Sequence, residues 1–318
     1  MPEVVMLVGF PASAKGTLAK TYKGYTILNR DSVGGAVQKL IPKMVVELTA
    51  GRNVVLDNTN CTLEDRTPFI AAAKKAKSPI HCVWVDTPLE DCQINALMRM
   101  WDRYGRVFFD LGEMKGVSSA DGRGANDDPN IFPAVALFAF KKKFVKPSID
   151  EGFATFTRQK FVRQWPVTLT EKALFLDYDD TLRRTLGGGK WPTEPSQIEI
   201  LPRRSKVLKD WEAKGYKLLG VSNQSGIGAG TMTHEQAQAC FNATNKMLGL
   251  DIHYRYCHHR PGPIGCYCRK PQSGSLISFI RQYNLDPKQC VFVGDQTTDK
   301  TCAERVGIKY VDQAEFFR

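Results

Sequence analysis

The stretch VVMLVGFPASAKGT, residues 4–17, decides the fold of the first part of this chain. Its apolar, largely β-branched start predicts a buried strand, which leads into a turn and a candidate helix. The strand pattern returns in YTILN, NVVLD and HCVWVD. Helical spacing marks TPFIAAAKKAK, LEDCQINALMRMWDRYG and FPAVALFAFKKKF, and a loop is expected at SSADGRGANDDPN, residues 118–130. Such alternation predicts a parallel sheet covered by helices.

The bulk composition is that of a globular protein. The chain has 318 residues, of which 42% are hydrophobic and 24% charged. No apolar stretch reaches the about 20 residues of a membrane helix, and the N-terminus lacks a signal pattern. We therefore expect an intracellular monomer, in the nucleus or cytoplasm, with no membrane contact. The nine cysteines are expected to be free thiols or metal ligands.

A net charge of +11 favours a polyanionic partner, above all nucleic acid. Solubility alone is the competing explanation. The strand–helix pattern pauses around QWPVTLTEK and resumes at KALFLDYDDTL. This pause predicts two domains, residues 1–165 and 166–318.

Four polar motifs of the second domain follow strand-like runs or lie between them. They are FLDYDDTL with Asp177 and Asp179, GVSNQSGIG with Ser222, CRKP with Lys270, and FVGDQTTD with Asp295 and Asp299. In an open α/β sheet, ligands bind beyond the carboxyl ends of the strands, where such groups can meet. Carboxylates can attack phosphorus, transfer protons and hold Mg²⁺, while a lysine and a hydroxyl bind phosphate oxygens. The set is complete for phosphoryl transfer.

These motifs resemble the haloacid dehalogenase phosphatase superfamily over residues 172 to about 315. The resemblance implies that Asp177 is the nucleophile and Asp179 the general acid/base, and that Ser222 and Lys270 bind phosphate. It also implies that Mg²⁺ is held by Asp177, Asp295 and the carbonyl of Asp179, with support from Asp299.

The stretch YCHHRPGPIGCYCRKP adds a metal-ligand pattern. Cys257, His259, Cys266 and Cys268 give three sulfurs and one imidazole, which is a closed set for structural Zn²⁺. The spacing is similar to the zinc loop of the heptose-bisphosphate and histidinol-phosphate phosphatases. Chance clustering of reduced cysteines is the alternative. A zinc ion here would fix the loop that presents Lys270.

The turn after the first strand nearly matches the phosphate-binding pattern G-x-x-x-x-G-K-[ST]. Ala14 replaces the second glycine, and Gly16 replaces the metal-binding hydroxyl. Ala12 also stands where the kinase family described in the next paragraph has glycine, and the resemblance implies positive φ angles for both alanines, at a cost on the order of 1 kcal/mol. The candidate ATP-binding residues are Gly9, Ser13, Lys15, Thr17 and Asp57.

With NRDSVGG, VVLDNTNCTLEDR, LEDCQINALMR and DEGF, residues 3–160 resemble the kinase domain of polynucleotide kinase/phosphatases. The resemblance implies that Asp31 is the base that deprotonates a nucleic-acid 5′-hydroxyl. The expected fold is α/β throughout: a P-loop kinase-like domain with a parallel sheet, then a Rossmannoid haloacid dehalogenase-like domain with a zinc-binding loop.

Together, the two resemblances predict an enzyme that heals nucleic-acid ends, with DNA favoured over RNA. It would combine a Mg²⁺-dependent 3′-phosphatase with an ATP-dependent 5′-kinase and would act before a ligase. One alternative is a small-molecule phosphatase acting on a sugar or histidinol phosphate. Another is that the first domain binds nucleic acid without catalysis.

Overall fold

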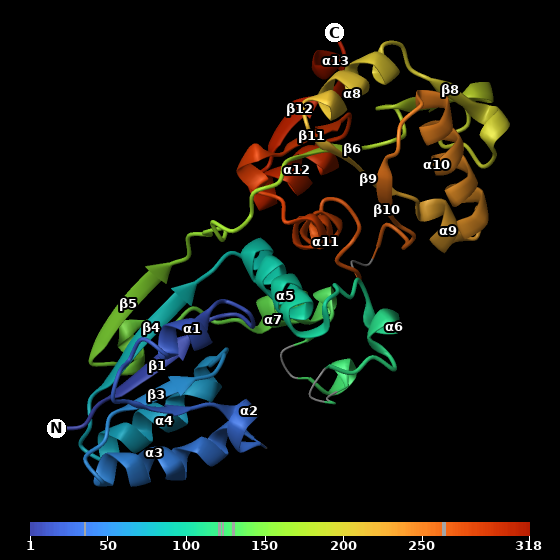
Figure 1. Cartoon of the computed structure of the whole chain (residues 1–318). Helices are drawn as coiled ribbons and strands as arrows, with labels where there is room; N and C mark the ends of the chain where they lie inside the picture. The colour runs from blue at the N-terminus through green and yellow to red at the C-terminus, as the bar shows by residue number, and fades with distance from the viewer. Residues whose placement is uncertain (35, 120–121, 123, 129–130, 263–264) are drawn as a thin grey trace. The chain divides into compact units, whose positions relative to one another are not determined.

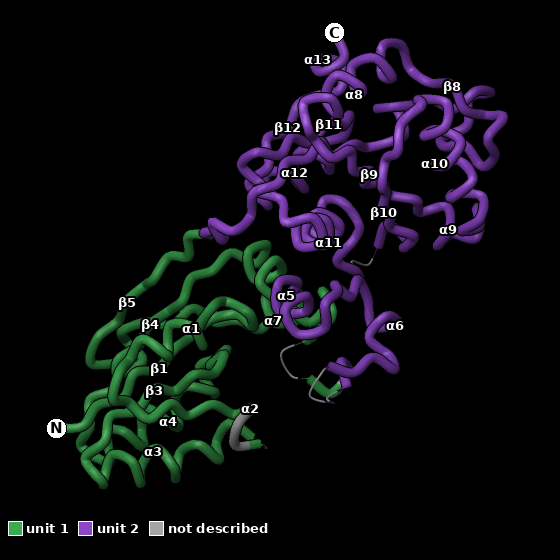
Figure 2. Tube along the Cα trace, viewed as in Figure 1, with its two compact units in different colours: residues 1–96, 127–163 green, residues 97–126, 164–318 purple. Residues whose placement is uncertain are grey.

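The computed structural model describes all residues except Gly35, 120–121, 123, 129–130 and 263–264 (Figure 1). The predicted loop at 118–130 therefore falls partly outside the described residues. The chain forms two compact units, residues 1–96 with 127–163, and residues 97–126 with 164–318 (Figure 2). The units are not continuous in sequence, because segment 97–126 groups with the second unit and not with the first. The expected domain bounds at 165/166 stay a prediction.

The first unit contains the parallel sheet that the sequence predicts. Its strand order is β2-β3-β1-β4-β5, and the pairings among its described residues are parallel. The strands are β1 (Val4–Val8), β2 (Thr26–Leu28), β3 (Val54–Asp57), β4 (Ile80–Asp86) and β5 (Thr155–Lys160). The helices of this unit are α1 (Lys15–Ala19), α2 (Arg30–Val33), α3 (Leu40–Thr49), α4 (Leu63–Lys75) and α7 (Ala134–Lys143). Helix α5 (Leu89–Tyr104) contains the division between the units.

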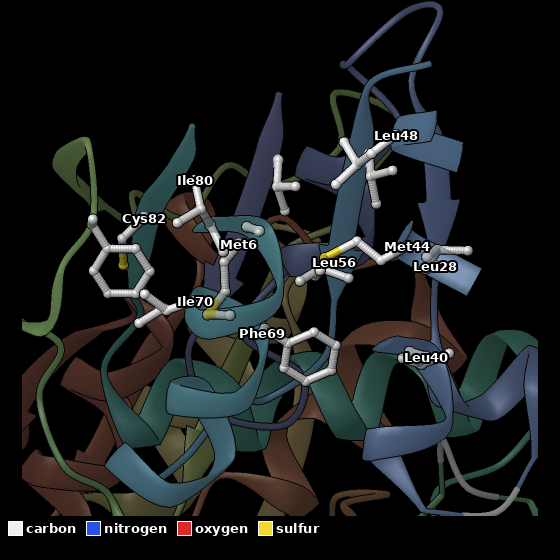
Figure 3. Packing of buried hydrophobic residues seen from close by; sticks show 14 of the residues in the cluster. Met6, Leu28, Leu40, Met44, Leu48, Leu56, Phe69, Ile70, Ile80 and Cys82 are labelled. Atoms are coloured by element: carbon white, nitrogen blue, oxygen red, sulfur yellow. The ribbon is translucent and has the colours of Figure 1, made fainter. Parts of the chain in front are cut away.

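Side chains of β1 alternate between two apolar layers, because successive residues of a strand point to opposite faces. Met6 packs with α3 and α4 in one buried cluster, whereas Leu7 packs with α1 in another. Figure 3 shows Met6 close to Phe69 and Ile70 of α4. The sheet is thus covered on both faces, which explains why its central strands are continuous apolar runs.

The second unit contains a second five-stranded sheet, of order β10-β9-β6-β11-β12, again with parallel pairings. Its strands are β6 (Ala173–Leu176), β9 (Lys217–Asn223), β10 (His253–Cys257), β11 (Val291–Gly294) and β12 (Lys309–Asp312). A hairpin of β7 (Arg183–Thr185) and β8 (Ile198–Ile200) follows β6. The helices are α6 (Leu111–Met114), α8 (Arg204–Ala213), α9 (Ser225–Ala229), α10 (His234–Leu248), α11 (Gly274–Tyr283), α12 (Thr297–Val306) and α13 (Gln313–Phe316).

The order of this sheet positions the candidate site. Strands β9 and β11 flank β6 on either side, so the carboxyl ends of three neighbouring strands lie at one edge.

None of the helices in the described part of the chain has the length and apolar character needed to cross a membrane. All nine cysteines lie among the described residues and are free thiols, as expected.

Candidate phosphoryl-transfer and metal sites

Asp177 and Asp179 follow β6 on a tight turn. The carbonyl of Tyr178 accepts hydrogen bonds from the backbone N–H groups of Leu182 and Arg183, and Asp180 has a φ of 59°. Asp177 is buried, with 7% of its surface exposed. The turn directs both carboxylates past the end of the strand.

Lys270 joins the acidic motifs at the centre of this site. Its Nζ lies 2.7 Å from Asp177 Oδ1 and 2.7 Å from Asp299 Oδ1, and it donates to the carbonyl of Val221 at 2.7 Å. The backbone of Lys270 is held by Asn223, whose side chain accepts from its N–H at 3.0 Å and donates to its carbonyl at 3.1 Å. The lysine therefore has a fixed position at the end of β9.

Asp179 is held by two donors. Arg183 Nε donates to one carboxylate oxygen at 2.9 Å, and Gln224 Nε2 donates to the other at 2.8 Å. Gln224 also donates to the hydroxyl of Ser222 at 3.0 Å. This amide thus links the candidate acid/base to the candidate phosphate-binding hydroxyl.

The site holds more negative than positive charge. Asp177, Asp295 and Asp299 each offer an oxygen within 4.8 Å of the others. Burial raises the pKa of Asp177 to about 8 although the Lys270 ammonium opposes the rise, and burial also raises the pKa of Asp295. Burial alone would lower the pKa of Lys270, but the two carboxylates beside it raise it above its usual range.

Mg²⁺ fits this donor set. It prefers oxygen ligands and is commonly held by one or two carboxylates that leave room for phosphate oxygens. The raised pKa of Asp177 marks a carboxylate that lacks sufficient positive charge around it, and a divalent cation would supply that charge. Thr181 Oγ1 donates to Asp295 Oδ1 at 3.3 Å and orients that candidate ligand.

Cys257, His259, Cys266 and Cys268 come together as a second cluster, with one ligand atom from each within 4.8 Å of the others. His259 Nδ1 lies 3.4 Å from the sulfurs of both Cys257 and Cys268, and the sulfurs of Cys257 and Cys266 are 3.8 Å apart. Tetrahedral bonds of about 2.3 Å to sulfur and about 2.0 Å to nitrogen place ligand atoms about 3.8 Å and about 3.5 Å apart. The donor spacing fits Zn²⁺. Residues 263–264 of this loop lie outside the described residues.

In the first unit, the turn after β1 has the backbone of a phosphate-binding loop. Ala12 and Ala14 have φ angles of 58° and 73°, as the sequence predicts for these positions. Lys15 is buried, and its Nζ contacts the carbonyls of Gly9 at 3.1 Å and Phe10 at 2.7 Å and the hydroxyl of Ser13 at 3.2 Å. Thr17 lies within helix α1 and donates its N–H to the carbonyl of Ala14.

The N-R-D and D-N-T-N motifs are adjacent to this loop. Asn29 donates to the backbone carbonyl of Asp57 at 2.8 Å and to its carboxylate at 3.3 Å. A Cβ built on Gly16 would lie 3.2 Å from Asp57 Oδ2. Asp31 is exposed in α2, and its N–H donates to Asn29. The position of the missing hydroxyl therefore faces Asp57.

Sequence reasoning missed Asn223, Gln224 and Arg183 as parts of the phosphatase-like site. Asn223 and Gln224 directly follow Ser222 in a motif that was recognised, so their proximity in sequence was an available signal. The sequence held no such signal for Arg183, because its pairing with Asp179 depends on the turn at Asp180.

Two family models match the chain. Residues 4–107 match an AAA domain, and residues 267–311 match a HAD-hydrolase-like domain. The D-glycero-β-D-manno-heptose-1,7-bisphosphate 7-phosphatase of Haemophilus ducreyi is 35% identical over 150 residues, covering 44% of this chain and 80% of that protein.

The bifunctional polynucleotide phosphatase/kinase of Schizosaccharomyces pombe is 30% identical over 154 residues, covering 48% of this chain and 32% of that protein. The solved structure of the Pnkp1/Rnl/Hen1 RNA repair complex aligns with 98% of this chain and 96% of its own chain, at 17% identity and a TM-score of 0.31. The matched models and the Haemophilus ducreyi relative show that the chain belongs to the HAD-hydrolase-like phosphatases and carries an AAA-type P-loop domain before its hydrolase part.

Proposed function

We propose that this chain heals nucleic-acid ends, with a Mg²⁺-dependent 3′-phosphatase in its second unit. Asp177 attacks the phosphorus of a terminal phosphate, so that an aspartyl-phosphate forms and the bond to the 3′ oxygen breaks. Asp179 gives that oxygen its proton. Asp179 then takes a proton from the water that attacks the same phosphorus, the bond between that phosphorus and Asp177 breaks, and inorganic phosphate leaves while the Asp177 carboxylate is restored.

The remaining residues of the site bind the phosphoryl group. Ser222 and Lys270 donate to its oxygens, and Lys270 balances part of its charge. Asp177, Asp295 and the carbonyl of Asp179 would hold Mg²⁺, with Asp299 in support. When bound, this ion would supply positive charge to the phosphoryl oxygens.

One observation carries the proposal of a nucleic-acid substrate: the AAA-type P-loop domain and the HAD-like site occur in one chain. The heptose-bisphosphatase match uses 44% of the chain to cover 80% of that protein, and it leaves the P-loop part without a role. A polynucleotide phosphatase/kinase gives both parts a role. The net charge of +11 suits a polyanionic substrate.

For the first unit we propose ATP-dependent phosphorylation of a 5′-hydroxyl. Lys15 would bind the ATP phosphates within the loop of Gly9, Ser13 and Thr17, and Asp31 would be the base. Gly16 weakens this site, because the hydroxyl that would hold Mg²⁺ is missing. We expect an intracellular monomer that prefers DNA to RNA and hands its ends to a ligase.

A second candidate is a small-molecule phosphatase. The observation that favours it is the 35% identity to a heptose-bisphosphatase, compared with 30% to the polynucleotide enzyme. In this case the substrate would be a sugar bisphosphate or histidinol phosphate, and the P-loop domain would not take part in the reaction.

The deciding experiment compares phosphate release from a 3′-phosphorylated oligonucleotide, a heptose bisphosphate and histidinol phosphate, each with Mg²⁺. We expect the highest kcat/KM for the oligonucleotide and no release by Asp177→Asn. A higher kcat/KM for either small molecule would favour the second candidate. A parallel assay with γ-labelled ATP and a 5′-hydroxyl oligonucleotide, with Lys15→Ala as control, tests the kinase.

A further inference from the structure

The imidazole of His259 has a different partner at each nitrogen. Nδ1 faces the sulfurs of Cys257 and Cys268, at 3.4 Å from each. Nε2 lies 2.8 Å from a carboxylate oxygen of Asp110. The side of the ring that faces away from the sulfurs is therefore in contact with a residue 149 positions earlier in the chain.

We infer that Asp110 is a positioning residue of the zinc site. An imidazole that binds a metal through Nδ1 keeps its proton on Nε2, where a carboxylate can accept it. Such an acceptor fixes the tautomer and the orientation of the ring and makes the imidazole a better ligand. Asp110 has this geometry toward His259, and the inference rests on the cluster of Cys257, His259, Cys266 and Cys268 being a zinc site.

Asp110 is itself held in place. Its Oδ1 accepts the N–H groups of Gly112 at 2.6 Å and Glu113 at 3.1 Å, at the start of α6. These bonds occupy one oxygen and leave Oδ2 directed at His259. The carboxylate is therefore oriented before a metal binds.

Phe109 adds a second contact between this segment and the zinc loop. Phe109 packs against the buried cluster of Cys257, Cys266 and Cys268. Its carbonyl accepts the N–H of Tyr267 at 2.9 Å. Segment 109–113 thus contacts the loop through a hydrogen bond to a ligand, a backbone hydrogen bond and apolar packing.

The two family models do not include this segment. The AAA match ends at residue 107, and the HAD-hydrolase-like match begins at residue 267. The zinc loop leads into Lys270 two residues after Cys268. A carboxylate from the first half of the sequence would therefore help to set the position of the lysine that contacts Asp177.

Zinc affinity of the full-length chain tests the inference. Removing an outer-shell carboxylate typically weakens metal binding about 10- to 100-fold. We expect that weakening for Asp110→Ala in competition with a chelator, together with an altered visible spectrum of the Co²⁺-substituted protein. Asp110→Asn can keep the oxygen that accepts the N–H groups of Gly112 and Glu113, but it would then place an amide NH2 group toward His259 Nε2, so it should also weaken zinc binding. Asp102→Asn is the matched control, because Asp102 pairs with Arg281 and is not part of the Cys/His cluster.

A double-mutant cycle separates this role from the capping of α6. His259→Cys replaces the imidazole with a fourth thiolate, so Asp110 then has no ring to orient. Asp110→Ala should leave zinc affinity unchanged in that background. Equal losses in both backgrounds, or wild-type affinity and an unchanged Co²⁺ spectrum for Asp110→Ala, would overturn the inference. A wild-type chain without zinc affinity would instead overturn the zinc site, while phosphate release reports separately on the proposed phosphatase.

Discussion

At the scale of single residues, Asp177 connects the fold to the proposed chemistry. Its carboxylate is buried against Lys270 and near two further carboxylates, and burial raises its pKa to about 8. The ordinary value is 3.8. A nucleophile must be ionised, so the free site does not favour the reactive form at neutral pH. A bound cation and a phosphate together would change the balance between the protonated and the ionised form of Asp177.

This shift predicts how pH and Mg²⁺ affect stability. Between about pH 4 and pH 8 the folded protein holds a proton on Asp177 that the unfolded chain has lost, so the contribution of this group to stability falls as the pH rises. Mg²⁺ binds the ionised form and offsets the loss. We therefore expect Mg²⁺ to raise the Tm more at pH 8 than at pH 5.5 in thermal unfolding. In Asp177→Asn the pH dependence of this Mg²⁺ effect should largely disappear; an unchanged dependence would argue against Asp177 as its source.

Gly16 gives a second prediction at this scale. Its missing Cβ would lie 3.2 Å from Asp57 Oδ2, so a serine there would place a hydroxyl beside the carboxylate. This is the hydroxyl that P-loop kinases use to hold Mg²⁺. We expect Gly16→Ser to raise ATP-dependent kinase turnover at least about tenfold, equivalent to about 1.4 kcal/mol of barrier. Gly16→Ala adds the same Cβ without the hydroxyl, and an equal gain from it would show that metal binding is not the cause.

Some of these residue-scale features could be predicted from the sequence, and others could not. The positive φ angles at Ala12 and Ala14 follow from their place in a known loop pattern, and the gathering of Asp177, Lys270 and Asp299 follows from strand ends. The contact of Asp110 with His259 could not be predicted, because a hydrogen bond across 149 positions leaves no local pattern.

At the scale of elements, the strands that the sequence predicts are the buried ones. β1, β3 and β6 are apolar runs and were expected at these places. The sequence analysis missed β5 because almost all of its side chains are exposed. Its sequence, TFTRQK, therefore lacks the alternation of apolar and polar residues that marks a half-buried strand. β10, at the other sheet's edge, reads HYRYC and is only partly buried. Edge strands form through backbone pairing, which a hydropathy pattern does not record.

A buried ion pair joins helix α4 to the segment just before β5. Arg66 on α4 is fully buried and donates twice to Glu151, at 2.6 Å each, and once to the carbonyl of Asn60 at 3.0 Å. Glu151 belongs to a short 3₁₀ turn just before β5. The pair therefore joins two elements that lie far apart in sequence.

We expect Glu151→Gln to lower the free energy of unfolding by about 3–5 kcal/mol, because it leaves a buried guanidinium without its counter-charge. Denaturant unfolding measures this change. Glu47→Gln is the matched control in the same unit: Glu47 pairs with Arg52, whose side chain is 53% exposed, and the loss should be much smaller because solvent weakens such pairs. Similar losses for both variants would mean that burial does not set the strength of the Arg66 pair.

At the scale of the whole molecule, each unit has its own sheet, its own core and its own polar site. The sequence predicts this division near residue 166, where the strand–helix pattern pauses. It does not predict that segment 97–126 groups with the second unit. Composition marks where a pattern stops, whereas the grouping of a segment depends on contacts such as that of Phe109 with the zinc loop.

This division predicts that the two proposed activities can be lost one at a time. Asp177→Asn removes the nucleophile of the second unit and should reduce 3′-phosphate release at least about 10³-fold, because its amide cannot form the aspartyl-phosphate. Lys15→Ala removes the cation of the P-loop in the first unit and should abolish transfer from ATP. The measurement assays both reactions on both variants, with circular dichroism to confirm folding. Each variant should keep the other activity within about twofold of the wild type, as expected for independent sites that share no residues. Loss of both activities in one folded variant would mean that the two sites depend on each other.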